Sequence, residues 1–193
     1  MKRYIRATIS DISNEDTESK IDIALDPNTS VELLTQLASD RNSDVRLCVI
    51  ANPNTPREVI NNMLFTNGDA RFLEKVALCM ETPVYVLDIL GNASDDSVRL
   101  AVARNTHTSP FTLSNLAKDD NAAIRWTVAG NKSLPPDSLE QLSEDWNPTV
   151  RGEVAENLNT PITIVENLLN DEVETVRQLA KRVYRWRVNN GRV

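Results

Sequence analysis

The chain repeats itself with a period of about 26 residues. Four octets are nearly the same: "VRLCVIAN" (45–52), "VRLAVARN" (98–105), "IRWTVAGN" (124–131) and "VRGEVAEN" (150–157). The first apolar residue of this pattern recurs at steps of 27, 26, 26, 26 and 26 residues, at Val45, Phe72, Val98, Ile124, Val150 and Val176. A unit this short cannot bury its own apolar face, so its copies must stack on one another to form a core.

Each repeat predicts two short helices separated by polar breaks. A threonine followed by proline, as in Thr160-Pro161, is typical of a helix start, with threonine as the cap and proline at the first helical position. Apolar residues then recur at three- and four-residue spacing, as in "VELLTQLA" (31–38), which predicts one buried helical stripe. The octet forms the second helix and ends on asparagine, a residue common at helix ends. No useful run of alternating apolar residues exists, so the sequence predicts an all-α fold.

This repeat resembles that of the leucine-rich repeat variant proteins, which reads approximately V-R-x-x-V-A-x-N-x-x-T-P-x-x-x-L-x-x-L-x-x-D. The match covers about residues 19–182. The resemblance implies a right-handed superhelical α-solenoid related to HEAT repeats, in which one helix of each pair is either α or 3₁₀. Some family members hold an iron–sulfur cluster in a cysteine-rich N-terminal segment, but residues 1–25 contain no cysteine and this feature does not carry over. Repeat folds host many functions, so the resemblance implies no specific activity.

We expect one solenoid domain over residues 1–193. Residues 1–25 would form an N-terminal cap and half repeat, 26–182 six repeats, and 183–193 a C-terminal cap or tail. The pattern fails in "FTNGDARFLEK" (65–75), where one residue is inserted and Leu73 replaces the arginine. This irregularity is either a tolerated loop insertion or a kink that shapes a binding surface.

Two polar columns recur with the repeat. The arginine column consists of Arg46, Arg99, Arg125, Arg151 and Arg177, and the asparagine column of Asn52, Asn105, Asn131 and Asn157. The arginines follow a column of aspartates by six residues, as in Asp119 and Arg125. A planar guanidinium can satisfy several acceptors at once, and a buried asparagine can bond free backbone groups between repeats. We interpret both columns as a structural ladder. The alternative for the arginines, a basic stripe for an anionic ligand, fits poorly beside the aspartates.

Charge and composition argue against several classes of function. Residues 1–175 hold 15 Lys/Arg and 28 Asp/Glu, a balance of −13, whereas residues 176–193 hold six basic residues and no acidic one. An acidic body repels phosphate backbones, which disfavours nucleic acid over most of the surface. No specific catalytic motif, histidine–cysteine cluster or glycine-rich phosphate loop is present, so we expect no enzyme, no metal and no cofactor.

The cysteines and the apolar runs bear on location. Cys48 and Cys79 are too few for a disulfide framework or a zinc motif, and they favour a reducing cytoplasm. No apolar run approaches the roughly 20 residues that a membrane span requires. We therefore expect a cytoplasmic protein with no membrane partner.

Two tryptophans depart from the repeat. Trp126 shares a column with Gly152 and Gln178, and a column that accepts such residues is not deeply buried. Trp146 lies in the polar break "SEDWNP" between two helices. Exposed aromatic side chains are enriched at binding surfaces, so both are candidates for partner binding. The alternative is partial burial against a neighbouring loop.

The C-terminal segment "KRVYRWRVNNGRV" (181–193) mixes basic and aromatic residues. On a helix, Val183 and Trp186 share a face that would cover the last repeat, with the arginines at its edges or exposed. The same segment could also bind an acidic partner or nucleic acid. The residues of this C-terminal basic cluster are Arg182, Tyr184, Arg185, Trp186 and Arg187.

These observations favour a non-enzymatic interaction scaffold that binds a protein partner on the solenoid surface, as a monomer or weak homo-oligomer. The alternative is a nucleic-acid-binding HEAT-like protein that uses the C-terminal basic cluster. A basic stripe along one face of several repeats would support that alternative. The sequence contains no such stripe.

Overall fold

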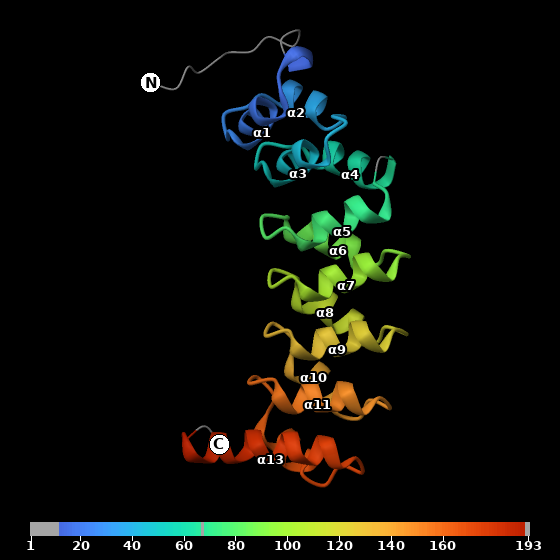
Figure 1. Ribbon diagram of the computed structural model, residues 1–193, viewed down its shortest axis with the longest axis vertical. Helices are drawn as coiled ribbons and strands as arrows, with labels where there is room; N and C mark the ends of the chain where they lie inside the picture. Colours follow the sequence, from blue (N-terminus) through green and yellow to red (C-terminus); the bar gives the residue numbers. More distant parts are fainter. Residues whose placement is uncertain (1–11, 67, 192–193) are drawn as a thin grey trace. The chain divides into compact units, whose positions relative to one another are not determined.

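The computed structural model describes residues 12–66 and 68–191, and every regular element in that part is helical (Figure 1). A 3₁₀ helix, η1 (Ile12–Asn14), precedes the α-helices. The first helices of the repeats are α2 (Val31–Leu37), α4 (Arg57–Thr66), α6 (Val84–Leu90), α8 (Pro110–Leu116), α10 (Pro136–Ser143) and α12 (Ile162–Leu168). The second helices are α1 (Thr17–Leu25), α3 (Ser43–Ala51), α5 (Ala70–Leu78), α7 (Asp96–Arg104), α9 (Ala122–Gly130), α11 (Pro148–Glu156) and α13 (Glu174–Asn189).

Both helices of each described repeat are therefore α-helices, and the 3₁₀ alternative does not apply here. The first 11 residues of the expected N-terminal cap, and Asn67 of the irregular segment, lie outside the described residues.

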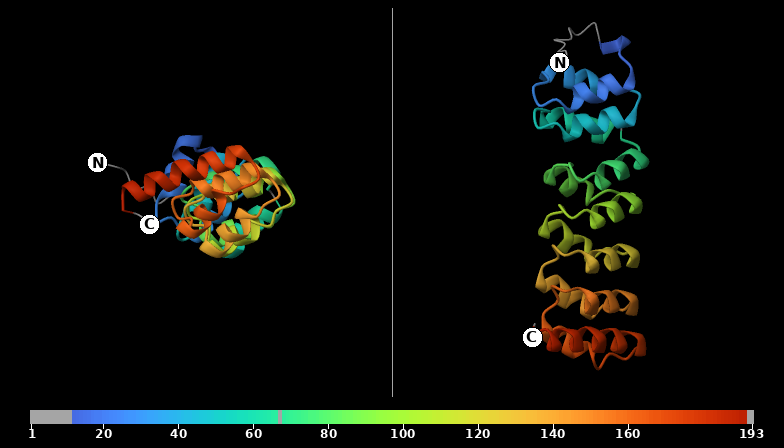
Figure 2. Two further views of the ribbon diagram at one scale, coloured as in Figure 1. Left: turned by 90° about the horizontal axis from the view of Figure 1, so that it is seen from below. Right: turned by 60° about the vertical axis from the view of Figure 1, so that its left-hand side comes forward.

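The chain divides into two compact units, one ending at Pro83 and the other beginning at Val84. In the first unit, α1 packs on α3 and α3 on α5. In the second, α7, α9, α11 and α13 pack successively on one another, and each shorter first helix packs against this layer. Figure 2 shows the helix pairs of the second unit, from green to red, following one another in chain order.

The core is built from the repeated apolar columns. The first residue of the octet is buried in every repeat, from Val45 to Val176. The first helices contribute a second set of buried side chains: Leu34, Ile60, Leu87, Leu113, Leu139 and Val165. Burial of each such side chain contributes about 1.5–3 kcal/mol, before the entropy cost of ordering the chain.

The threonine column has a different role from the one that its position predicts. Thr55 does not cap the helix that follows. Its hydroxyl donates to the carbonyl oxygen of Val49, 2.5 Å away, at the end of the preceding helix. Thr108 and Thr160 bond Val102 and Val154 in the same way, at 2.6 Å. The cap is the next residue, such as Ser109 before α8, so proline in that column precedes the first helical position. The predicted cap was wrong by one residue because the helix end before it leaves carbonyls that need a donor.

The side of the last helix, α13, that is buried against the preceding repeat differs from the predicted one. Its buried positions are Val176, Ala180, Val183 and Arg187, whereas Trp186 is 42% exposed. The prediction that Trp186 covers the last repeat and that Arg187 is exposed was therefore wrong.

Arg187 is 5% exposed, and its guanidinium donates to the carbonyl oxygens of Thr160 (2.5 Å) and Asn157 (2.9 Å). In preceding repeats an asparagine side chain bonds the equivalent carbonyl, but Val183 occupies that position here. Arg187 replaces the missing amide, and burial lowers the pKa of its guanidinium.

We predict that Arg187→Gln destabilises the protein by roughly 1–3 kcal/mol, because two buried carbonyl groups lose their charged donor. Arg185→Gln, which changes an exposed arginine of the same helix, should change the free energy of unfolding by less than about 0.5 kcal/mol. Urea unfolding of both variants and the wild type measures the difference. Equal losses for the two variants would contradict the capping role of Arg187.

Candidate functional site

The arginine column joins each repeat of the second unit to the next. Nη1 of Arg125 donates to the backbone carbonyls of Asp119 (2.7 Å) and Asp120 (3.0 Å) in its own repeat. Its Nε and Nη2 donate to the carboxylate of Asp145, at 2.6 and 3.0 Å, in the following repeat. Arg99 bonds Asp119, and Arg151 bonds Asp171, through the same pair of nitrogens. Each arginine thus pairs with the carboxylate 20 residues later, and with only the backbone of the residue six positions earlier.

These bidentate pairs shift the ionisation of both partners. Burial raises the pKa of the Asp145 carboxyl, but hydrogen bonds from Arg125 and from the Asn147 N–H outweigh it, and the pKa falls below 3.8. For Asp171 the hydrogen bond from Arg151 is the main cause of a lowered pKa. The same bonds raise the pKa of both guanidinium groups. The carboxylates of Asp145 and Asp171 are therefore ionised at neutral pH and form ion pairs with the arginines.

In the first unit this arrangement changes at Arg46. Its Nη1 donates to the Asp40 and Arg41 carbonyls, at 2.8 and 3.2 Å, but Thr66 stands 20 residues later in place of an aspartate. The buried Nε has no hydrogen-bond partner, and the guanidinium lies over the Phe72 ring, 4.4 Å from its centroid. A cation–π contact thus takes the place of the ion pair.

Both ends of the arginine column also depart from the central pattern. Lys20 occupies the arginine position one repeat before Arg46, and its ammonium lies 3.0 Å from the carboxylate of Asp40. At the other end, Arg177 donates to the backbone carbonyls of Asp171 and Glu172 and pairs with Glu174. Lys20 was missed in the sequence because lysine breaks the arginine motif.

The asparagine column makes a second set of bonds between repeats. Nδ2 of Asn131 donates to the carbonyl oxygens of Ala103 (2.9 Å) and Asn105 (3.2 Å) in the preceding repeat. Asn52 and Asn157 bond their preceding repeats in the same way. Asn105 accepts from the N–H of His107 through Oδ1, at 2.9 Å. Side chains of the arginine column and of the asparagine column therefore both donate hydrogen bonds to backbone carbonyls of the protein itself.

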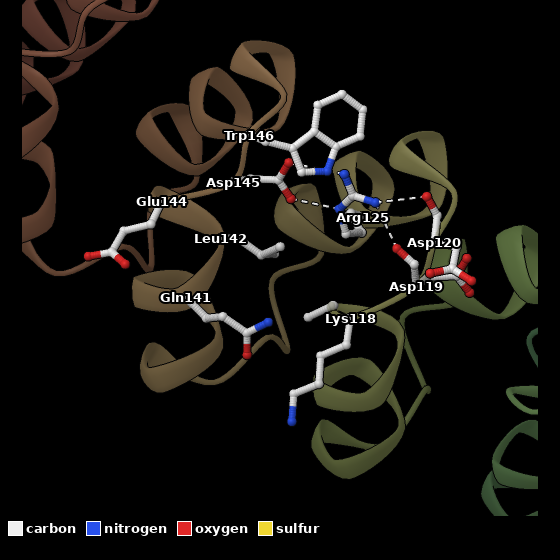
Figure 3. Close-up of a pocket in the computed structure, with 10 residues that line it drawn as sticks. Lys118, Asp119, Asp120, Arg125, Gln141, Leu142, Glu144, Asp145 and Trp146 are labelled. Atoms are coloured by element: carbon white, nitrogen blue, oxygen red, sulfur yellow. Dashed lines mark hydrogen bonds and ion pairs between the residues drawn. The ribbon is translucent and has the colours of Figure 1, made fainter.

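A cleft of about 480 Å³ lies over one of these arginine pairs (Figure 3). Lys118, Asp119 and Asp120 line it from one repeat, and Gln141, Leu142, Glu144, Asp145 and Trp146 from the next. The Trp146 ring lies over the Arg125 guanidinium, 5.2 Å from ring centroid to Cζ, and is 75% exposed. A smaller cleft of about 340 Å³, lined by Arg99 and sharing Lys118, Asp119 and Asp120, lies one repeat earlier.

Trp126 does not line this cleft. It lies on α9, is 44% exposed, and its indole N–H bonds the carboxylate of Glu153 on α11. Burial and the nearby Glu156 raise the pKa of Glu153, and the Trp126 bond partly opposes them. Gly130 leaves room for this carboxylate, since a Cβ there would lie 2.7 Å from Oε1. The two predicted tryptophans therefore occupy separate sites.

The C-terminal basic cluster does not form one basic surface. Arg187 is buried, and Arg182 pairs with Glu156. Tyr184 is half-buried, while Arg185 and Trp186 are exposed. The structure thus removes Arg187 from the predicted partner-binding residues.

Sequence reasoning missed Lys118, Asp120 and Glu144. Lys118 and Asp120 flank Asp119, just as Glu144 and Trp146 flank Asp145. These flanking positions differ from repeat to repeat while the aspartate between them recurs, and that contrast was the available signal. Among the described residues, no group of three or more His, Cys, Asp or Glu side chains could hold a metal ion.

Stacked α-helix pairs, joined by side-chain bonds that recur in several repeats, define an α-solenoid repeat protein. The chain is similar to the solved structure of "a leucine-rich repeat variant with a novel repetitive protein structural motif", with 27% identity and a TM-score of 0.57 over 86% of this chain and 70% of that chain. The resemblance to leucine-rich repeat variants and the all-α solenoid class are confirmed.

A second solved structure, an engineered protein, matches at 16% identity with a TM-score of 0.38, too low to inform the fold. No family model matches the sequence, and no curated protein matches it.

We predict that Arg125→Ala destabilises the protein by roughly 1–3 kcal/mol, since it leaves the Asp145 carboxylate and two carbonyl groups without their donor. Arg104→Ala, which removes an exposed arginine of the same unit, is the control and should cost less than about 0.5 kcal/mol. Thermal melts of both variants test this. A melting temperature of Arg125→Ala equal to that of wild type would show that the column does not hold the repeats together.

A second prediction concerns pH. The pKa of Asp171 is lower in the folded protein than its ordinary 3.8, so its charge stabilises the fold above about pH 3.8, and this stabilisation is lost as pH falls through the folded pKa. Asp171→Asn should therefore be less stable than wild type at neutral pH, and the difference in free energy of unfolding should narrow as the pH falls below about 3.8. Urea unfolding over this range measures the gap. Glu166→Gln, at an exposed carboxylate of α12, is the control, and a gap that does not change with pH would refute the prediction.

Proposed function

We propose that this protein is a non-enzymatic scaffold that binds a protein partner at the cleft under Trp146. The observation that carries the proposal is the 75% exposure of Trp146 at the edge of a cleft of about 480 Å³. Large aromatic side chains are enriched at protein interfaces, where they supply much of the binding energy. Repeat folds commonly use their extended surfaces for such binding.

The alternative, a nucleic-acid-binding protein, has less support. With Arg182 paired to Glu156 and Arg187 buried, the C-terminal basic cluster retains Arg185 as an exposed cation outside ion pairs with described residues. Lys181, next to the cluster, is a second such cation. Residues 84–175 of the same unit hold 15 Asp/Glu against six Lys/Arg, a balance of −9. This charge opposes the approach of a phosphate backbone. We therefore favour a protein partner.

We further propose a cytoplasmic location and a monomer or weak homo-oligomer. Burial raises the pKa of the Cys48 thiol and of the Cys79 thiol, which keeps both in the less reactive protonated form. None of the described helices is long and apolar enough to cross a membrane.

The proposed function predicts that host proteins captured by the wild-type chain are lost when Trp146 is changed to alanine. Quantitative mass spectrometry after affinity capture would compare wild type, Trp146→Ala and Phe111→Ala. Phe111 is 73% exposed in the same unit and controls for the loss of any exposed aromatic side chain. Loss of an aromatic contact at an interface costs about 1 kcal/mol or more, which is roughly a fivefold or greater loss of affinity.

Thermal melts would first establish that both variants are folded. Capture of the same proteins in the same amounts by wild type and Trp146→Ala would refute the proposed site.

A further inference from the structure

We propose that the cleft under Trp146 binds an arginine side chain from a basic segment of the partner protein. The inference rests on the proposed function and specifies the chemistry of the partner. It follows from the geometry of the tryptophan ring, the charges around the cleft and its size.

The indole ring of Trp146 is placed to contact a second cation. Arg125 lies against Trp146, and its guanidinium is fixed by the Asp145 carboxylate and by backbone carbonyls. Trp146 nevertheless remains 75% exposed. Figure 3 shows its ring beside the Arg125 guanidinium. The face of an indole ring is electron-rich and attracts cations, and a planar guanidinium stacks on it well. A second arginine, from a partner, can therefore stack on the part of the ring that Arg125 leaves uncovered.

The residues that line the cleft carry several carboxylates. Asp119 and Asp145 are paired with Arg99 and Arg125. Asp120 and Glu144, on opposite sides of the cleft, have exposed side chains that form no hydrogen bond or ion pair with the described residues.

Because Arg99 and Arg125 balance Asp119 and Asp145, the remaining charges that line the cleft are those of Asp120, Glu144 and Lys118, a net charge of −1. A cationic segment is thus complementary to the cleft, while an acidic segment or a phosphate backbone is repelled.

The cleft also has a volume suited to a bound side chain. A volume of about 480 Å³ lies within the range of roughly 300–1,000 Å³ that is common for ligand sites. The smaller cleft one repeat earlier shares Lys118, Asp119 and Asp120 with it. A basic segment can therefore extend from one cleft to the next, with an arginine anchored at Trp146.

The proposal is tested with a fluorescein-labelled peptide of alternating glycine and arginine, whose binding is measured by fluorescence anisotropy. Peptides with lysine or glutamate in place of arginine are compared. We expect the arginine peptide to bind most tightly, the lysine peptide more weakly and the glutamate peptide not at all. The affinity of the protein for the arginine peptide should fall as salt concentration rises, because exposed ion pairs are screened.

Variants of the cleft make the test specific. Trp146→Ala should weaken binding of the arginine peptide roughly two- to fivefold, as expected for an exposed cation–π contact, while Trp146→Phe should retain part of the affinity. Asp120→Asn and Glu144→Gln should weaken binding, and Lys118→Gln should strengthen it. The matched controls are Glu140→Gln and Lys132→Gln, which change exposed charges outside the cleft and should have smaller effects.

Three outcomes would overturn the proposal. The arginine peptide could bind wild type and Trp146→Ala with equal affinity. The wild-type protein could bind the lysine peptide as tightly as the arginine peptide, or bind the glutamate peptide more tightly than either. A labelled single-stranded oligonucleotide that binds more tightly than the arginine peptide would also overturn it. If any of these occurs while affinity capture still depends on Trp146, the scaffold function stands and the partner chemistry assigned here is wrong. If the peptide binds as expected but capture is unchanged, the proposed function fails instead.

Discussion

The stacking of the repeats in the second unit depends on one arginine at each junction. A break between two helices leaves backbone carbonyls without donors, and the guanidinium of Arg125 supplies two of these hydrogen bonds within its own repeat. Its remaining nitrogens bind the Asp145 carboxylate of the next repeat. Burying an isolated charge would be costly, but here the two charges are paired through two hydrogen bonds. One side chain thus closes a helix break and fixes the position of the following repeat.

At two places where a column residue is missing, another residue supplies a contact in its stead. Thr66 offers no carboxylate to Arg46, and the ring of Phe72 covers the guanidinium instead. Val183 has no side-chain amide that could donate to the carbonyl oxygen of Asn157. The guanidinium of Arg187, one turn later on α13, donates to that oxygen instead. At the last repeat the requirement is that the carbonyl acceptor be satisfied, not that a particular residue type satisfy it. At Arg46 the buried Nε has no hydrogen-bond partner, and the guanidinium has the ring contact instead.

The same pairing determines which residues are available for binding. Asp119, Arg125 and Asp145 are committed to holding the repeats together. The side chains of their sequence neighbours Asp120 and Glu144 form no such pair and extend into solvent around the cleft. Trp146 is also largely exposed, although its ring contacts the Arg125 guanidinium. This separation allows the flanking residues to differ from repeat to repeat without loss of the fold. It is the physical basis for proposing a scaffold whose specificity depends on those flanking positions.

The sequence by itself determined the 26-residue period, the helix pairs, the buried apolar columns and the polar columns, because each depends on spacing along the chain. Only the tertiary structure decided which acceptor each polar side chain reaches. Arg125 binds the carboxylate 20 residues later and not the one six residues earlier, and Thr55 donates backwards to Val49. Likewise α13 buries Arg187 and exposes Trp186. Spacing places residues on one face of a helix, but the rotation of that helix against its neighbours, and the backbone acceptors found there, are set by packing between repeats.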